Sequence, residues 1–171
     1  MVYRYYHRLN PWQQRIYRRS DQINAIPVPA ANELVEVTLA IGRALTLGEP
    51  QKSYWHAISY CAASVRDWVT PPGVTVLAER PAGKWGELHG LYNPAQGPDG
   101  MITVWMRTAK RSRVVAFRTF LRTLLHELCH HLDFVLLKLN HSFHTKGFYQ
   151  RESSLYKQLL LPATPPGPVP G

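Results

Sequence analysis

The sequence predicts an α+β domain in which a small three-stranded sheet packs on one long helix. Segments with apolar residues at helical spacing occupy the two ends of the chain, and three short runs rich in β-branched and aromatic residues lie between them. A chain of 171 residues suffices for one domain with a buried core. We expect that domain to span residues 30–161, preceded by a basic arm at 1–29 and followed by a disordered, proline-rich tail at 162–171.

Four helices account for the apolar periodicity. They are expected at residues 30–47, 53–69, 114–139 and 147–161. Ser53 is a candidate N-cap for the second helix, and proline and glycine residues follow the first two. The third helix is the longest, and we expect the sheet to pack on it.

Three strands are expected, at Val74–Leu77, Trp85–Tyr92 and Met101–Met106. Gly90 interrupts the second run, which indicates either a bulge or a point where another element approaches the backbone closely. The basic connector at 107–113 is expected to be a solvated loop, with a phosphate-facing loop as the alternative.

The chain is strongly basic, with a formal net charge of +9. Such a charge favours an acidic partner, nucleic acid before an anionic membrane, and does not bear on the fold. The arm at 1–29 interleaves arginines with tyrosines and Trp12, a combination that suits phosphates and stacked bases. We rank an arm packed on the domain first, contact with DNA close behind, and a pro-segment across the active site last.

Cys61 and Cys129 both lie in apolar helical patterns and form no C-x-x-C pair, so we expect reduced core thiols. The N-terminal residues lack the apolar segment of a secretory signal, and no apolar run is long enough to span a bilayer. These features predict a cytoplasmic protein without a membrane partner, and its charge is compatible with association with the nucleoid. The sequence carries no indication of oligomeric state.

The stretch His126-Glu-Leu-Cys-His130 has the pattern H-E-x-x-H. Residues four apart share one face of a helix, so two imidazoles can hold one metal ion, and Glu127 can reach a water on that metal. Five of the eight histidines lie between positions 126 and 144, a clustering that packing alone does not explain. His131 is expected to face the side of Glu127 or solvent. Asp133 is expected either to accept a ligand's ring N–H or to lie on the surface.

A catalytic zinc ion takes three protein ligands and keeps one open position, so a third ligand must come from outside the helix. His144 is the first candidate, because it follows a loop that can turn the chain back and precedes Phe148, which can anchor it in the core. Glu152, two helical turns further on, is the second candidate, either as a ligand or as a group that orients one. His141, in the loop itself, is the third.

These motifs resemble those of the SprT-like (Spartan-type) zinc metallopeptidases. The likeness rests on the H-E-x-x-H run, the loop after it, and the stretch His144-Thr-Lys-Gly-Phe148. The family has its third histidine in H-G-x-x-F, whereas here Thr145 stands at the glycine position and the glycine is Gly147. The likeness covers roughly residues 73–160, and no cysteine-rich zinc ribbon follows the motifs in this sequence.

The resemblance implies a zincin-like fold and hydrolysis of peptide bonds, with Zn²⁺ held by His126, His130 and His144. Glu127 then acts as general base toward a zinc-bound water. Together with the basic charge, the resemblance suggests a substrate near DNA, such as a crosslinked protein, with DNA contacted through the basic surface and the arm.

Two further roles complete this hypothesis. Tyr149, Tyr156 or Arg151 is expected to stabilise the oxyanion. Ile102 and Val104 belong to the strand expected at the sheet edge, on which an extended polypeptide substrate adds as a further strand.

Three alternatives to this hypothesis stand. The chain is a gluzincin-type peptidase with Glu152 as third ligand, a non-enzymatic nucleic-acid-binding module with a structural zinc, or a protein without metal whose motif is fortuitous. The presence of Glu127 argues against a structural zinc, because a structural site needs no base.

Overall fold

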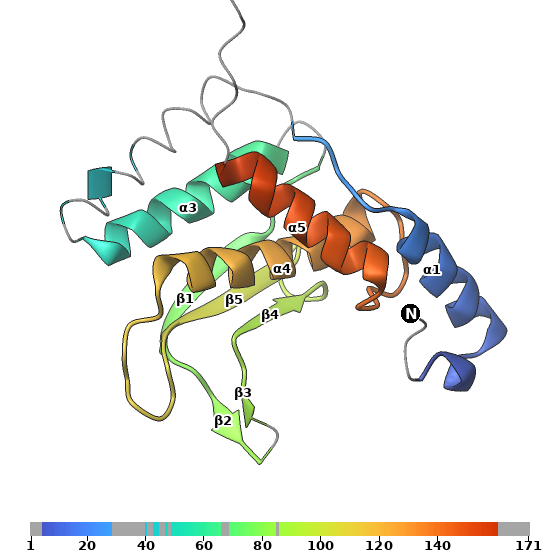
Figure 1. Cartoon of the computed structure of the whole chain (residues 1–171), viewed down its shortest axis with the longest axis horizontal. Coiled ribbons are helices and arrows are strands. Elements are labelled where there is room, and N and C mark those ends of the chain that lie inside the picture. Colours follow the sequence, from blue (N-terminus) through green and yellow to red (C-terminus); the bar gives the residue numbers. More distant parts are fainter. Residues whose placement is uncertain are drawn as a thin grey trace, which may run out of the picture.

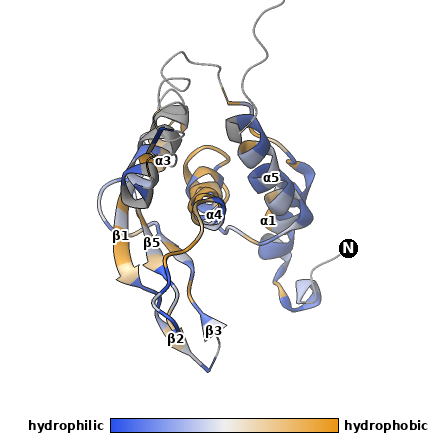
Figure 2. Cartoon of the chain, turned by 60° about the vertical axis from the view of Figure 1, so that its left-hand side comes forward, coloured by the Kyte–Doolittle hydropathy of each residue, from blue (hydrophilic) through white to orange (hydrophobic). Residues whose placement is uncertain are grey.

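Helix α4 (Phe117–Val135) is the central element of the described chain, since it contacts α3, α5 and two strands of the sheet. It lies on one face of a three-stranded sheet, with α3 (Pro50–Val65) along one side and α5 (Lys146–Leu160) along the other. Helix α1 (Pro11–Gln22) packs on α5 (Figure 1). Seen nearly end-on in Figure 2, α4 lies between α3 and α5 with the sheet beneath it, so most of its circumference is covered.

The computed structural model describes residues 5–28, 40, 43–44, 47, 49–65, 69–84 and 86–160. The helix expected at 30–47 lies largely outside these residues, and the proline-rich tail at 162–171 lies wholly outside them. The other three expected helices correspond to α3, α4 and α5, with boundaries that differ by several residues. Helix α3 begins already at Pro50, three residues before the expected cap, because proline is well suited to a first helical turn.

The sheet confirms the expected number of strands but divides them differently. Its order is β1 (Gly73–Glu79), β5 (Met101–Arg107), β4 (Gly90–Asn93), with β1 parallel and β4 antiparallel to β5. The run expected as one strand at 85–92 is split, because β3 (Gly86–Glu87) pairs instead with β2 (Ala82–Gly83) in a separate ribbon.

The prediction that Ile102 and Val104 lie on an edge strand is wrong. Strand β5 is hydrogen-bonded on both sides, to β1 and to β4, and the two side chains are 1% and 0% exposed in the core. Strand order depends on pairings between segments distant in the chain, which a local pattern does not encode. Strand β4 is the edge strand of the described sheet that contacts α4. This strand, and not β5, borders the cleft described below.

The core joins α4 to its neighbours through complementary apolar faces. Tyr54 of α3 stacks on Phe120 of α4, with ring centroids 4.2 Å apart, and its hydroxyl donates to the Val115 carbonyl. Leu125 and Leu132 of α4 are completely buried. Within the described residues, no helix combines the length and the apolar character needed to cross a membrane.

The basic arm contains a helix that the sequence analysis did not predict. Asn10 caps α1 in a capping box with Gln13, each side chain accepting a hydrogen bond from the other's backbone N–H, and Pro11 occupies the first helical position. These residues are the sequence signals that could have located the helix. Tyr17 and Ser20 are buried, as expected of an arm packed on the domain.

Candidate metal centre

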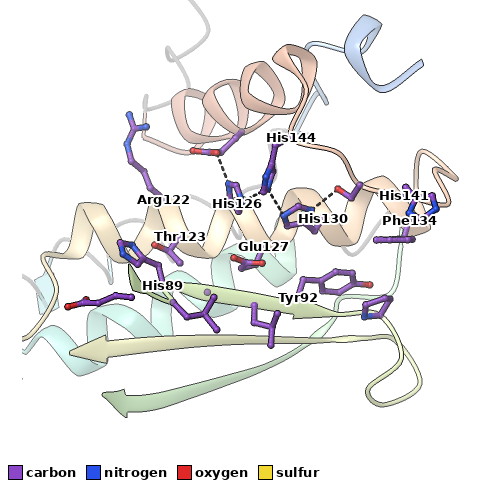
Figure 3. Close-up of a pocket in the computed structure, with 17 residues that line it drawn as sticks. His89, Tyr92, Arg122, Thr123, His126, Glu127, His130, Phe134, His141 and His144 are labelled. Carbon is purple, nitrogen blue, oxygen red and sulfur yellow. Dashed lines mark hydrogen bonds and ion pairs between the residues drawn. The ribbon is translucent and has the colours of Figure 1, made fainter. Parts of the chain in front are cut away.

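Helix α4 presents His126 and His130 on one face, toward α5 and the loop between the two helices (Figure 3). Their spacing of four residues places the ring centroids 5.0 Å apart. Glu127, the next residue after His126, faces strand β4. One stretch of helix therefore supplies two imidazoles and a carboxylate to the same cleft.

The loop after α4 returns His144 to these two histidines. Its Nε2 lies 3.0 Å from His126 Nε2 and 3.1 Å from His130 Nε2. Within the described part of the chain, these three residues form the one cluster whose ligand atoms lie close enough to hold a metal ion, all within 4.8 Å of one another. The first candidate for the third ligand is thus the one that the structure brings to the pair.

The hydrogen bonds behind the rings fix which nitrogen carries the proton. His126 Nδ1 lies 3.0 Å from the Glu152 carboxylate, and an ionised carboxylate only accepts, so Nδ1 holds the hydrogen. Ser142 donates its hydroxyl to Asp133 at 2.7 Å, so it accepts from His130 Nδ1 at 2.6 Å. Both rings therefore turn an Nε2 lone pair toward His144.

This donor set fits a metal ion. Nitrogen lone pairs that face one another at about 3 Å repel unless a hydrogen or a cation lies between them. His144 has a single Nε2, and a hydrogen on it could bond to only one of the other two nitrogens at a time. Metal-bound histidines commonly donate their other ring N–H to a carboxylate, directly or through a second group. Both arrangements occur here, directly at His126 and through Ser142 at His130.

Phe148 forms the apolar base of the cluster. It is completely buried, and its ring centroid lies 4.7–5.0 Å from those of His126, His130 and His144. Each imidazole therefore has one side against the same ring, which limits its rotation. This is the anchoring role that the H-x-x-x-F spacing predicts.

Glu152 and His141 occupy other positions around the site. Glu152 approaches His126 at Nδ1, the ring nitrogen opposite the three converging Nε2 atoms, so it orients this histidine. His141 lines the cleft, but its ring packs edge-on against Trp12 at 5.2 Å and stacks on Phe143 at 5.4 Å.

Glu127 is held against β4 by a very close approach of strand and helix. A Cβ atom at Gly90 would lie 2.5 Å from Glu127 Oε1 and 2.8 Å from Thr123 Cγ2, so any larger residue there would displace these two side chains. Of the two interpretations of Gly90, close backbone approach is therefore the one that applies. The Tyr92 backbone N–H donates to the Glu127 carboxylate and holds it in place.

Burial sets the proton affinities of the site. It raises the pKa of Glu127 to about 7, against the smaller opposing effects of His126 and of the Tyr92 N–H. Burial also lowers the pKa of His130 to about 3, and that of His144 in the same direction, helped by neighbouring histidines. The neutral imidazole, which is the form that binds metal, is thus favoured at both positions.

The cleft in front of these residues is open and has a volume of about 760 Å³. Strand β4 lines it with Gly90, Leu91 and Tyr92, and α4 lines it with Arg122, Thr123 and the motif residues. Leu91 is 46% exposed. The cleft therefore places the histidine cluster and Glu127 beside the outermost described strand of the sheet.

The three candidates for the oxyanion contact lie in different environments. Tyr149 is exposed and stacks on His144 with ring centroids 5.7 Å apart, so it adjoins the cluster. Tyr156 is buried beneath Arg122, whose guanidinium lies 4.2 Å from its ring centroid. Arg151 is completely buried in an ion pair with Asp133, so the prediction that it faces a substrate is wrong.

The remaining motif residues are structural. Cys129 is a buried free thiol, as expected. His131 is also buried, with Nδ1 3.1 Å from the Tyr92 hydroxyl and Nε2 3.0 Å from the Thr70 carbonyl, so its solvent-facing interpretation is wrong. Asp133 is buried too, and it reaches His130 through Ser142 rather than directly.

The sequence analysis did not predict two contacts: the hydrogen bond between Ser142 and His130, and the ion pair between Arg151 and Asp133. Serine is common in loops, so nothing in the local sequence distinguishes Ser142 as a partner of a metal ligand. The sequence does give a signal for the Asp133 carboxylate, because its spacing of three residues after His130 places it one helical turn from that histidine.

No protein-family model, no curated protein and no solved structure matches the chain.

Substitution of each candidate ligand by alanine separates the two kinds of role. We expect His144→Ala to abolish stoichiometric metal binding, and Glu152→Ala to weaken it by about 10- to 100-fold because His126 loses only its orienting partner. His141→Ala serves as the control and is expected to bind as the unsubstituted chain does. Metal content after dialysis and competition with a chromophoric chelator measure both quantities. Full metal binding by His144→Ala would contradict the assignment.

Proposed function

We propose that this chain is a zinc-dependent peptidase of the SprT-like kind, with Glu127 as its general base. The observation that carries the proposal is the convergence of three imidazole Nε2 atoms in the same cleft as a buried carboxylate of raised pKa. A structural metal site needs no such group, whereas hydrolysis needs a base with a pKa near the working pH.

The donor set supports zinc as the metal. Three neutral imidazoles are a common ligand set of catalytic zinc. With Zn–N distances of about 2.0–2.1 Å in a tetrahedral arrangement, ligand nitrogens lie roughly 3.3 Å apart. The Nε2 separations of 3.0 and 3.1 Å around His144 are close to that value. When bound, zinc supplies Lewis acidity, which lowers the pKa of water and polarises a carbonyl.

Glu127 carries the proton transfers in this proposal. Its carboxylate accepts a proton from the attacking water and later delivers it to the leaving amine. The Tyr92 N–H and the close contact with Gly90 hold it in one position, so little reorganisation is needed. Tyr149, which stacks on His144 at the exposed side, is the remaining candidate for the oxyanion contact.

Strand β4 is the surface on which an extended polypeptide substrate is held. It is the outermost described strand on the side of α4, and Leu91 exposes its side chain to the cleft. An added strand hydrogen-bonds through its main chain and so accepts many sequences. This replaces the earlier assignment of that role to Ile102 and Val104.

The exchange Glu127→Gln tests the proposal directly. The amide has nearly the same size but cannot accept the proton, so we expect unchanged zinc content and a loss of peptide hydrolysis of about 100-fold or more. Cleavage of an unfolded protein substrate measures activity, and Glu49→Gln, on the surface at the start of α3, is the matched control. An active Glu127→Gln protein would refute the mechanism, and zinc binding without hydrolysis by the unsubstituted chain would favour a structural zinc.

Activity should also depend on pH in a defined direction. Glu127 is protonated below its pKa of about 7 and cannot then accept a proton. A bound cation favours the carboxylate and moves the value down, so kcat/KM is expected to rise with pH along a limb centred at or below about 7. A pH profile at saturating zinc measures this limb. A pH profile of the zinc-loaded protein without a rising limb at or below about pH 7 would contradict the role of Glu127.

The substrates of this peptidase lie near DNA. Support comes from the net charge of +9 and from Arg8, Arg15 and Arg18, which are all exposed in the segment around α1. Arg19 in the same helix is engaged instead, since it donates to the Leu137 carbonyl at 2.9 Å. Exposed arginines on a helix that packs on α5 suit contact with phosphates, and so a polypeptide held on nucleic acid.

Combined replacement of Arg8, Arg15 and Arg18 by alanine tests contact with DNA and leaves the buried residues of α1 in place. Each lost phosphate contact is expected to reduce the slope of log K against log salt by about 0.9, so the slope falls by up to about 2.7. Fluorescence anisotropy with a labelled duplex measures it. The charge-matched control replaces Lys110, Arg111 and Arg113, exposed in the loop before α4. A flattened slope only in this control would reject the role of the arm.

A further inference from the structure

Arg151 is the most unusual buried residue outside the cluster. Its side chain is completely buried, and Nη2 lies 2.8 Å from a carboxylate oxygen of Asp133, which is buried as well. Buried ion pairs are retained only when further hydrogen bonds offset their desolvation. Those bonds are made with the end of α1. Arg151 Nη1 donates to the carbonyls of Ser20 and Ile23 at 2.7 and 2.6 Å, and Nη2 donates to the Ser20 hydroxyl at 3.0 Å.

The same ion pair continues to the metal cluster. Asp133 accepts from Arg151 with one oxygen and from the Ser142 hydroxyl with the other. Ser142 in turn accepts from His130 Nδ1. A continuous series of hydrogen bonds therefore leads from the C-terminal end of α1 to a ligand ring, and it fixes the tautomer that turns the Nε2 lone pair to the metal.

The end of α1 also holds the start of α5, next to His144. Asp21 accepts from the Gly147 backbone N–H at 3.1 Å, and Ser20 shares a hydrogen bond of 3.3 Å with Thr145, the residue before α5. A Cβ atom at Gly147 would collide with the Ser20 carbonyl and lie 2.7 Å from that of Asp21. This contact lies between His144 on one side and Phe148 on the other.

We propose that α1 is a working part of the metal centre: docked through Arg151, Asp133 and Ser142, it positions His130 and thereby sets the affinity for metal. Arg151, Asp133 and Ser142 are positioning residues, since none is a ligand. The inference rests on the metal-binding part of the proposed function and adds to it that the basic arm and the site act as one unit.

Coupling of this kind is reciprocal, so it can be measured in the unsubstituted chain. If docked α1 tightens zinc binding, bound zinc must favour the docked state of α1 by the same factor. Amide hydrogen exchange in residues 11–22 is therefore expected to slow on saturation with zinc, although no residue of α1 is a ligand. Exchange in this helix that is the same with and without zinc would overturn the proposal.

Two substitutions test the coupling from the side of the metal. Ser142→Ala removes one oxygen from the series and leaves the ion pair intact, and we expect zinc affinity to fall by about 10- to 100-fold. Gly147→Ala favours helix α5 by propensity but places a methyl group against the α1 carbonyls, so exchange in α1 should rise while zinc affinity falls. Ser153→Ala, exposed on α5, is the control for both and should bind zinc as the unsubstituted chain does.

The outcomes distinguish this inference from the proposed function. The coupling is overturned if Ser142→Ala binds zinc as tightly as the control does. It is also overturned if Gly147→Ala speeds amide exchange in α1 but leaves the zinc affinity unchanged. If Gly147→Ala fails to fold, Ser142→Ala and the exchange experiment still decide the question. An unsubstituted chain that takes up no zinc would instead overturn the proposed function.

Discussion

The mutual repulsion of imidazole lone pairs is the constraint on which the rest of the site depends. His126 and His130 both carry their proton on Nδ1, because a carboxylate or a serine accepts it there. Their Nε2 atoms therefore face His144 at 3.0 and 3.1 Å without hydrogens of their own. Holding three such rings together at the wall of an open cleft requires rigid support, which the buried Phe148 supplies from behind.

Those parts of the site that follow from one helix and one turn could be predicted from the sequence. The spacing of His126 and His130 requires only that the segment be helical, and its apolar residues indicate that it is. The position of Phe148 four residues after His144 likewise indicates that both belong to one turn. Such statements use local periodicity, and the arrangement of these side chains in the structure agrees with them.

What depended on long-range packing could not be predicted. The order of the strands, and hence the burial of β5, follows from pairings across some 30 residues. Arg151 was one of three candidates for the oxyanion contact, because an arginine in a sequence gives no sign that it is buried. Thr145 accepts from the Phe148 N–H, a local contact at the start of α5, whereas Gly147 makes room for α1, a contact with a segment distant in the chain.

Two buried carboxylates on α4 show how the same helix provides both a base and a support. Burial raises the pKa of each. At Asp133 the Arg151 guanidinium opposes this effect through a direct ion pair, so the carboxylate stays an acceptor for Ser142. At Glu127 the opposing groups are weaker, a histidine and one backbone N–H, and the pKa rises to about 7. The two carboxylates lie on different sides of α4, because Asp133 faces Arg151 of α5 and Glu127 faces strand β4, so the ion pair with the guanidinium acts on Asp133.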